Sequence, residues 1–465
     1  MGKRVWQLIL ALGLLLLLSG CMSQSGEDFY ALPQLPEDYL SLQQTINTVM
    51  NDLGAEYAAP SAGSNTQNIQ LQDLDGDGVQ ESALAFFRVA SAEKPLKIYV
   101  FRQNEATGEY ETAWIIEGVG TAIYSIAFEN LGGTGEKEIV VSWQISAKTQ
   151  SLAAYALQRD GDVVELMRSG YTRSAVLDLD RDNEKEIVLL QLDTAENNSR
   201  AELYKYDNGL MVHTSAVSLS SGITDIQAAK VGALTNLMPA LFVSSDFGEN
   251  GGRITDIITL RDGALTNLTQ DEASGMSLST IRYYTDFKDV NGTDINNDGI
   301  LELPMPELLP AVGENATPMY LLHWIQCTPD GEAATVYTTF HCYDDGWYLI
   351  LPEEWQGRVT IARRESSGSV AGSERAVAFY NLPQEHAGAE AADEAAEPVE
   401  FLTIYRLTGS NRTHRASIDE RFKLFESSDV IYAARFRSGQ WDCGLDQDGL
   451  QERFCRIKVD WSAEN

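Results

Sequence analysis

Short runs in which apolar and polar residues alternate recur along most of the chain, and turns that contain glycine separate them. "YALQRDGDVVELM" and "IITLRDGALTNL" are examples, each with Asp-Gly between two such runs. Asp-Gly and Asn-Gly in this setting are strong signals for a two-stranded hairpin. Five hairpins with a glycine turn are predicted, at Gly108, Gly161, Gly209, Gly263 and Gly346. The chain is therefore expected to be mainly β-structure.

A second motif precedes the hairpins, with one copy in each repeat. "DLDGDGVQE" spans residues 73–81, "DLDRDNEKE" spans 178–186 and "DINNDGILE" spans 294–302. "NLGGTGEKE", at 130–138, keeps the turn and the final acid, and a segment from Lys230 keeps only the outline. The copies start 48 to 64 residues apart, and a period of this order is typical of propellers and repeat arrays. Each repeat then reads strand, acidic loop, strand, strand, glycine turn, strand, which is a four-stranded blade.

The acids of these loops stand at alternate positions, so the chain can coil and bring several oxygens to one point. Such a cluster favours a hard cation, and Ca²⁺ is the usual one. An EF-hand begins in the same way, but it needs a bidentate Glu at the twelfth position, which here is Leu84, and a helix on each side. We expect Ca²⁺ ligands in three loops: Asp73, Asp75, Asp77, Val79 and Glu81; Asp178, Asp180, Asp182 and Glu186; Asp294, Asn296, Asp298 and Glu302. The alternatives are an Asp-rich turn without metal and, in the third loop, a register that starts at Asp289.

Loops of the form Asp-x-Asp-x-Asp-Gly-x-x-Glu between strands, repeated at blade length, resemble the FG-GAP/VCBS-type repeats of integrin-α-like β-propellers. The resemblance covers roughly residues 60 to 350, although no complete Phe-Gly…Gly-Ala-Pro signature is present. It implies a β-propeller in which about five blades are recognised, and the sequence leaves open whether there are more. It also implies Ca²⁺ coordination by the three acidic loops.

The start of the chain has the order of a secretory signal. Lys3 and Arg4 precede an apolar run, and "LSGC" follows it with Cys21 at the end, which resembles a bacterial lipobox. By that resemblance residues 1–20 are a signal peptide and Cys21 carries the lipid that anchors the protein to the membrane. The alternative is an uncleaved anchor, but the apolar run is shorter than the ~20 residues that span a bilayer. We expect an extracytoplasmic protein, lipid-anchored to the bacterial cell membrane.

The net charge limits the classes of partner, and the number of cysteines limits the disulfides. The chain has 68 Asp and Glu against 34 Lys and Arg, a net charge of −34, so it would repel nucleic acid. Ca²⁺ is abundant outside cells, where weak sites also fill.

After Cys21, four cysteines are too few for a disulfide scaffold. Cys327 and Cys342 either form a hairpin bridge or, with the other two, are buried free thiols.

Two segments flank the predicted propeller at 61–350. Residues 21–60 are interpreted as a lipid tether and a short helix that docks on the first blade, since Leu42, Ile46, Val49 and Leu53 lie on one helical face. The alternative is that this segment is part of a flexible tether. Residues 351–465 are interpreted as a small α+β domain with a disordered Ala/Glu-rich insertion near 383–399. Within it, an amphipathic helix is expected to continue through Ile457 to Trp461, with Asp446 as its N-cap.

Motifs for catalysis are missing from the sequence. It has no G-x-S-x-G, no H-E-x-x-H and no phosphate-binding glycine loop, and five histidines leave little material for acid–base chemistry. A zinc site from His323, Cys327, His341 and Cys342 is disfavoured, because the adjacent His341 and Cys342 would point to opposite faces of a strand. We favour a non-enzymatic module that binds a protein or a glycan. The alternative is a secreted carbohydrate-active hydrolase or lyase that uses carboxylates on the propeller face.

Overall fold

The computed structural model describes residues 37–457 apart from 105, 148, 249–250, 283–289, 314–315, 366–372, 384–396 and 438–440. The predicted signal peptide, Cys21, most of the Ala/Glu-rich insertion, Asp289 and Trp461 therefore lie outside the described residues. Within the described ranges, no helix has the length and apolar character that a membrane crossing requires.

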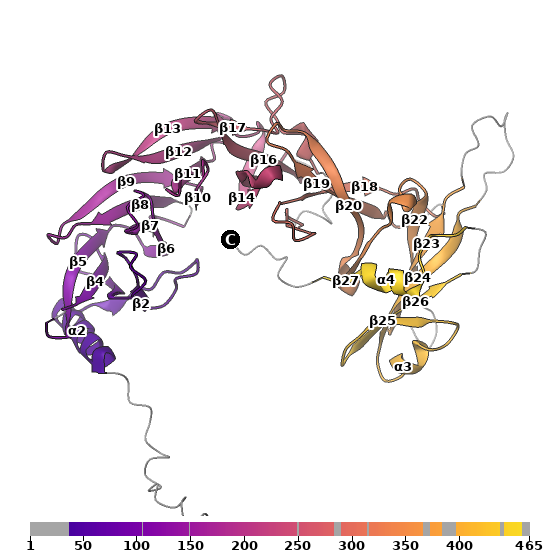
Figure 1. Ribbon diagram of the computed structural model, residues 1–465, viewed down its shortest axis with the longest axis horizontal. Helices are drawn as coiled ribbons and strands as arrows, with labels where there is room; N and C mark the ends of the chain where they lie inside the picture. Colours follow the sequence, from indigo (N-terminus) through magenta and orange to yellow (C-terminus); the bar gives the residue numbers. More distant parts are fainter. Residues whose placement is uncertain are drawn as a thin grey trace, which may run out of the picture.

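Five antiparallel sheets follow one another in chain order and are called blades 1 to 5 (Figure 1). Blade 1 holds β2 (Ile69–Gln72), β3 (Ser82–Arg88), β4 (Leu96–Gln103) and β5 (Tyr110–Gly118), with β1 (Glu56–Tyr57) also paired to β3. Blade 2 holds β6 (Ala122–Glu129), β7 (Glu138–Gln144), β8 (Gln150–Leu157) and β9 (Val163–Tyr171). Blade 3 holds β10 (Arg173–Leu177), β11 (Glu186–Gln191), β12 (Arg200–Asp207) and β13 (Leu210–Ser218). Blade 4 holds β14 (Ile223–Ala233), β15 (Pro239–Phe247), β16 (Gly252–Arg261) and β17 (Ala264–Asn267). Blade 5 holds β18 (Leu303–Leu308), β19 (Tyr320–Cys327), β20 (Ala333–Cys342), β21 (Trp347–Ile350) and β27 (Phe454–Arg456).

The predicted fold class, a mainly-β chain of four-stranded propeller blades, is confirmed. In blades 1 to 4 the acidic loop or its remnant joins the first two strands, and a glycine turn joins the last two. Blade 5 departs from this order, because a single bridge between Thr293 and Glu302 stands in place of its first strand. The matching turn, between β19 and β20, is therefore at Gly331, and the predicted Gly346 lies one hairpin later.

Apolar side chains between consecutive blades hold the stack together. Phe86 and Ile98 of blade 1 pack with Ile139 and Trp143 of blade 2, and similar clusters join blades 2 to 3, 3 to 4 and 4 to 5. The approach is close, since a Cβ on Gly118 would lie 2.2 Å from the Trp143 ring. Each inner blade thus buries both of its faces against its neighbours in the chain.

The stack is an open arc, so its two end faces need other cover (Figure 1). Helix α2 (Glu37–Leu53) covers the free face of blade 1, where Leu42 and Ile46 pack against Phe87 and its neighbours. This confirms the predicted helix and its apolar face. The helix ends at Leu53, and Gly54 follows it with a φ of 58°, which suits a glycine.

A sixth sheet covers the free face of blade 5. It holds, in spatial order, β22 (Val359–Glu365), β23 (Glu374–Asn381), β24 (Val399–Thr408), β26 (Val430–Phe436) and β25 (Phe422–Glu426). Phe340 and Trp347 of blade 5 share one core with Trp355 and Phe379 of this C-terminal part. The C-terminal part is therefore a further layer of the stack. The short helices are α3 (Arg412–Arg415), α4 (Gln447–Arg453), η1 (Thr235–Leu237), η2 (Leu278–Thr280), η4 (Tyr343–Asp345) and η5 (Glu353–Trp355).

The predicted C-terminal helix is correct at its start and wrong at its end. The Asp446 side chain accepts a hydrogen bond from the Gly449 N–H at 2.8 Å, as expected of an N-cap. The helix stops at Arg453, and Phe454–Arg456 form β27. The reason is tertiary: β27 pairs with β21, and the Phe454 ring stacks on Trp347 at 5.6 Å.

The cysteines and histidines of blade 5 form neither a disulfide nor a zinc cluster within the described residues. Cys327 pairs with Ala333 at the start of β20, whereas Cys342 ends that strand, so they are separated by nine residues of strand. At ~3.3 Å per residue that is about 30 Å, too far for a bridge. His341 is stacked on Tyr348, and burial lowers its pKa to about 3.

The end cap is testable through Ile46, which is fully buried in α2. Ile46→Ala removes apolar contacts with blade 1 and leaves a cavity, so the free energy of unfolding should fall by about 2–5 kcal/mol. Leu40→Ala on the same helix is the control, because Leu40 is 44% exposed. Urea denaturation followed by circular dichroism measures both. Equal losses in the two variants would contradict the capping role.

Candidate metal centres

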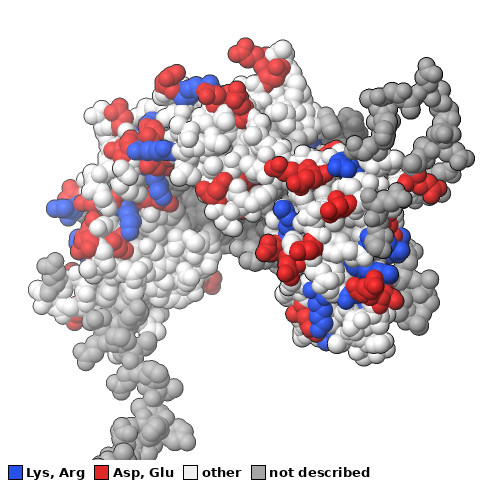
Figure 2. Space-filling view, turned by 45° about the vertical axis from the view of Figure 1, so that its right-hand side comes forward, with Lys and Arg blue, Asp and Glu red and all other residues white. Residues whose placement is uncertain are grey.

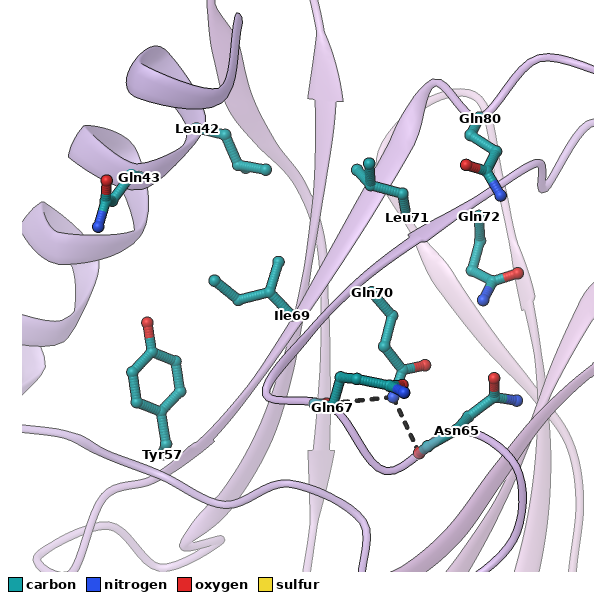
Figure 3. Close-up of a pocket in the computed structure, with 10 residues that line it drawn as sticks. All are labelled: Leu42, Gln43, Tyr57, Asn65, Gln67, Ile69, Gln70, Leu71, Gln72 and Gln80. Carbon is teal, nitrogen blue, oxygen red and sulfur yellow. Dashed lines mark hydrogen bonds between the residues drawn. The ribbon is translucent and has the colours of Figure 1, made fainter. Parts of the chain in front are cut away.

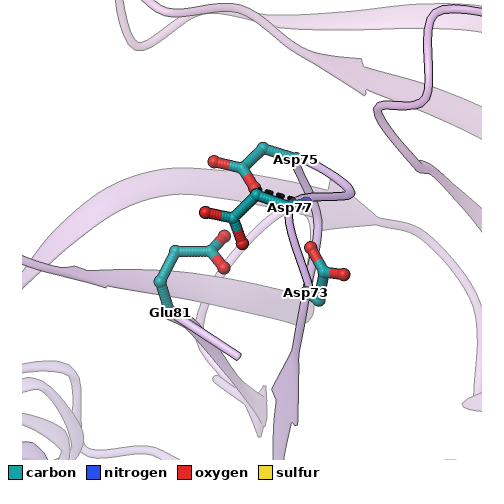
Figure 4. Close-up of side chains that lie close together, drawn as sticks. All are labelled: Asp73, Asp75, Asp77 and Glu81. Carbon is teal, nitrogen blue, oxygen red and sulfur yellow. Dashed lines mark hydrogen bonds between the residues drawn. The ribbon is translucent and has the colours of Figure 1, made fainter. Parts of the chain in front are cut away.

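The first acidic loop, between β2 and β3, is closed by its own carboxylates (Figure 4). Asp73 accepts hydrogen bonds from the Gly76 N–H at 2.7 Å and the Gly78 N–H at 3.1 Å. Asp75 and Asp77 each accept a bond from the N–H two residues further on. These turns bring one oxygen each from Asp73, Asp75, Asp77 and Glu81 within 4.8 Å of one another. Since Ca²⁺ binds oxygens at 2.3–2.6 Å, ligands on opposite sides of one ion lie about 5 Å apart.

The electrostatics of this loop suit a cation. Burial alone would raise the pKa of Asp73, but the N–H groups of Gly76 and Gly78 and the Lys137 ammonium together hold that pKa below its ordinary value. The Glu81 Oε2 atom is buried and accepts no hydrogen bond from the residues that the structure describes. Carboxylates this close repel each other unless a positive charge lies between them. The donor set therefore fits Ca²⁺, with Val79 able to offer only its backbone carbonyl.

The loop before β18 in blade 5 repeats this geometry. Asp294 accepts bonds from the Asp298 and Gly299 N–H groups at 3.0 and 2.9 Å. Oxygens of Asp294, Asp298 and Glu302 gather within 4.8 Å. The Asn296 amide donates to Asp298 at 2.9 Å, beside this group. Burial raises the pKa of Glu302, which is fully buried.

The loop of blade 3 has the same backbone path but a different charge balance. Asp178, Asp180 and Glu186 converge, whereas Asp182 is outside the group and accepts the Glu184 N–H at 2.8 Å. The Lys205 ammonium contacts Asp180 and lies 3.3 Å from Glu186. The chain itself thus supplies a positive charge at this site, so the site fits a divalent ion less well.

Lys205 could not be identified from the motif, because it lies on the separate strand β12. The strand register is the signal that finds it: Ile187 pairs with Tyr204, which places Glu186 opposite Lys205. In blade 5 the same register places Gln326 opposite Glu302, and the Gln326 amide donates to Glu302 at 2.8 Å. A neutral amide in blade 5 therefore stands where blade 3 has a cation.

In three of the four loops that end in glutamate, this residue has a structural role in addition to any metal. Glu138 of the degenerate loop accepts the Leu131 N–H at 2.8 Å. In the same way Glu186 accepts the Leu179 N–H at 2.7 Å and Glu302 accepts the Ile295 N–H at 2.9 Å. This bond explains why a loop without the other acids keeps its glutamate.

Neighbouring loops also contact one another. A Cβ on Gly76 would lie 2.2 Å from the Gly135 carbonyl oxygen, and the Lys137 N–H donates to Leu74 at 2.8 Å. The acidic loops belong to blades 1, 3 and 5, with loops that lack the acid cluster between them. The alternation of loops with and without an acid cluster limits repulsion between packed loops. Figure 2 shows acidic and basic side chains next to one another over parts of one face.

No protein-family model matches this chain, and no curated protein sequence matches it significantly. Among solved structures, it is similar to a protein from Lactobacillus plantarum (10% identity, TM-score 0.28, 69% of this chain and 82% of that chain). It is also similar to a Bacillus licheniformis rhamnogalacturonan lyase (13%, 0.29, 56% and 60%) and to the Dos1 propeller (9%, 0.27, 65% and 64%). TM-scores this low carry no functional information. The blade assignment rests on the strand order and the stacked cores of the chain itself.

Replacing Lys205 tests whether the chain's own cation weakens the blade 3 site. Lys205→Gln reproduces the blade 5 arrangement, so we expect one additional Ca²⁺ to bind, or its affinity to rise at least tenfold. Isothermal titration with CaCl₂ measures both quantities. Lys185→Gln is the control, since it removes the same charge from a pair with Glu129 outside the cluster. Identical titrations for the two variants would contradict the assignment.

Proposed function

We propose that this protein is a lipid-anchored, extracytoplasmic binding module of a bacterial cell, stabilised by Ca²⁺ in the loops of blades 1 and 5. The observation that carries the proposal is the convergence of carboxylate oxygens in these two loops, four in blade 1 and three in blade 5. In blade 1 the nearest ion pairs to the group are long, at 3.5 Å from Arg102 to Asp75 and 3.7 Å from Lys137 to Asp73. In blade 5 a neutral glutamine faces the group.

Bound Ca²⁺ would neutralise the carboxylates and fix the loop conformation. The residues that would hold it are those of the two groups: Asp73, Asp75, Asp77 and Glu81 in blade 1, and Asp294, Asp298 and Glu302 in blade 5. Because the blade 1 loop abuts the loop of blade 2, a fixed loop would also stabilise the contact between these blades.

Acids outside the loops already serve as structural partners, which favours binding over catalysis. Asp256 is fully buried and accepts four hydrogen bonds, two from Ser220 and one each from Asn267 and Ser277. Glu374 accepts two bonds from the Arg421 guanidinium at 3.1 and 3.2 Å. Such satisfied acids are poor proton donors or acceptors for a substrate.

A hydrolase or lyase is the second candidate, and one pocket favours it. A cavity of about 410 Å³ between blades 1 and 2 is lined by Glu81, Glu136, Glu138 and Trp114, among others. Paired carboxylates beside an aromatic ring are compatible with cleavage of a polysaccharide. Turnover of a polysaccharide that stops on Glu136→Gln would establish this candidate in place of the binding module.

Chelation tests the calcium proposal. An ion that binds the folded state alone stabilises it by about 2.7 kcal/mol at a hundredfold excess over Kd. The melting temperature of the purified chain from residue 22 onward should therefore rise with CaCl₂ and fall with EDTA. Asp75→Asn should remove part of the response, while Asp330→Asn, whose side chain is 91% exposed, should keep it. Melting curves that do not change between CaCl₂ and EDTA would contradict the proposal.

The membrane anchor is tested separately. Cys21→Ala removes the sulfur that would carry the lipid, so the variant should leave the membrane fraction of the expressing bacterium. Fractionation and metabolic labelling with a fatty acid measure this. Retention in the membrane fraction with unchanged label would show that the anchor is not at Cys21.

A further inference from the structure

A pocket of about 540 Å³ lies between α2 and β2 in blade 1 (Figure 3). Ten residues line it, and none of them is charged, although 22% of the chain is charged. Five of the ten are glutamines. The volume is within the range of ligand-binding pockets. An uncharged lining in a chain with a net charge of −34 argues against an ionic ligand.

The pocket follows the outer edge of strand β2. All four residues of the strand, Ile69–Gln72, line it. Because successive side chains of a strand point to opposite faces, a pocket that touches all four must enclose the strand's edge. Among the described residues, β2 pairs with β3 alone.

The hydrogen-bond pattern shows which backbone groups face the pocket. The Phe86 N–H donates to the Asn68 carbonyl at 3.4 Å, so Asn68 directs its backbone groups toward β3. In an antiparallel pair this direction alternates along the strand. The N–H and C=O groups of Ile69 and Leu71 therefore point away from β3, into the pocket.

This edge lacks the charges, prolines and bulges that protect many edge strands. Charges, prolines and bulges block unwanted pairing, and the sequence "IQLQ" of β2 has neither a charge nor a proline, in a register without a bulge. The corresponding strand of blade 2 is covered, because the Ser61 and Ala62 N–H groups donate to Tyr124 at 3.1 and 2.8 Å. The edge strand β18 carries two prolines.

The two walls of the pocket differ in chemistry. Leu42, Ile69 and Leu71 form an apolar wall on the α2 side, and the other wall carries amides (Figure 3). Among these amides, the Gln70 nitrogen is held by the Asn65 and Gln67 carbonyls at 2.9 and 3.2 Å. The Gln70 Oε1 atom is buried in this wall and accepts no hydrogen bond from the described residues.

We propose that this pocket binds an extended peptide, which adds to blade 1 as a strand beside β2. The exposed backbone groups of Ile69 and Leu71 would pair with the peptide backbone. Because a strand directs alternate side chains to opposite faces, the peptide should alternate apolar residues, toward Leu42, with neutral polar residues, toward Gln70. The inference rests on the proposed binding role and names the class of partner.

An array of uncharged heptapeptides tests the predicted pattern. Peptides that alternate Val or Leu with Thr or Gln should bind the purified protein, and peptides of the same composition in apolar and polar blocks should bind at least tenfold more weakly. The strongest binder is then N-methylated at either its odd or its even residues. One methylated form should lose at least tenfold in affinity and the other should retain it, because the strand pairs through one edge. Equal binding of alternating and block peptides, or equal behaviour of the two methylated forms, overturns the proposal.

A pair of protein variants locates the site. Leu71→Lys should weaken binding at least tenfold, whereas Val212→Lys, at a position 41% exposed on β13, should leave it unchanged. Melting curves check that both variants fold. If Leu71→Lys does not fold, the N-methylated peptides still test the proposal, because they are measured with the unaltered protein. Peptide binding that Leu71→Lys leaves unchanged overturns the proposal, as does a neutral oligosaccharide that binds in place of any peptide. Failure here with an intact calcium response would leave the proposed module standing.

Discussion

A four-stranded blade with two apolar faces is unstable in water by itself, and the rest of this structure depends on how those faces are covered. The inner blades cover each other in chain order, so each contact joins neighbouring repeats, as in other repeat proteins. In an open arc, the outer faces of the first and last blades remain uncovered by other blades. Helix α2 closes one of them and the C-terminal sheet closes the other. The helix and the C-terminal part, which have no repeat motif, are in this sense required by the repeats.

The same stacking determines what the loops can be. Consecutive loops come so close that Gly76 has no room for a side chain beside Gly135. Acid clusters in adjacent blades would repel each other at this distance, and the chain places them in alternate blades. It also places one positive charge, the Lys205 ammonium, against the middle cluster, which offsets part of its negative charge. The three loops look equivalent as motifs, yet they differ in what the third strand of each blade presents to them.

Local features were predictable from the sequence, because short-range spacing determines them. The four-stranded blade, the face of α2 that carries Ile46 and the N-cap at Asp446 are examples. Features set by distant partners were not. Helix α4 stops at Arg453 because β21 offers an edge for pairing, which the helical spacing of the sequence does not reveal. Blade 5 has two Asp-Gly turns, and only the strand pairing shows that the one at Gly331 is the repeat's own.

Within the candidate site, the sequence found the acids that converge but not their counter-groups. Asp73 and its partners follow from alternate spacing, whereas Lys205 and Gln326 are known only from strand register. The pocket beside β2 likewise could not be predicted from the sequence, since a helix and a strand edge from separate segments form it.

Anomalous scattering from crystals grown in CaCl₂ would test the calcium sites, because it both counts and locates the ions. We expect a peak in the Asp73 loop and another in the Asp294 loop, each 2.3–2.6 Å from carboxylate oxygens, and none beside the Lys205 ammonium. Crystals with no peak in either of the first two loops would contradict the calcium proposal.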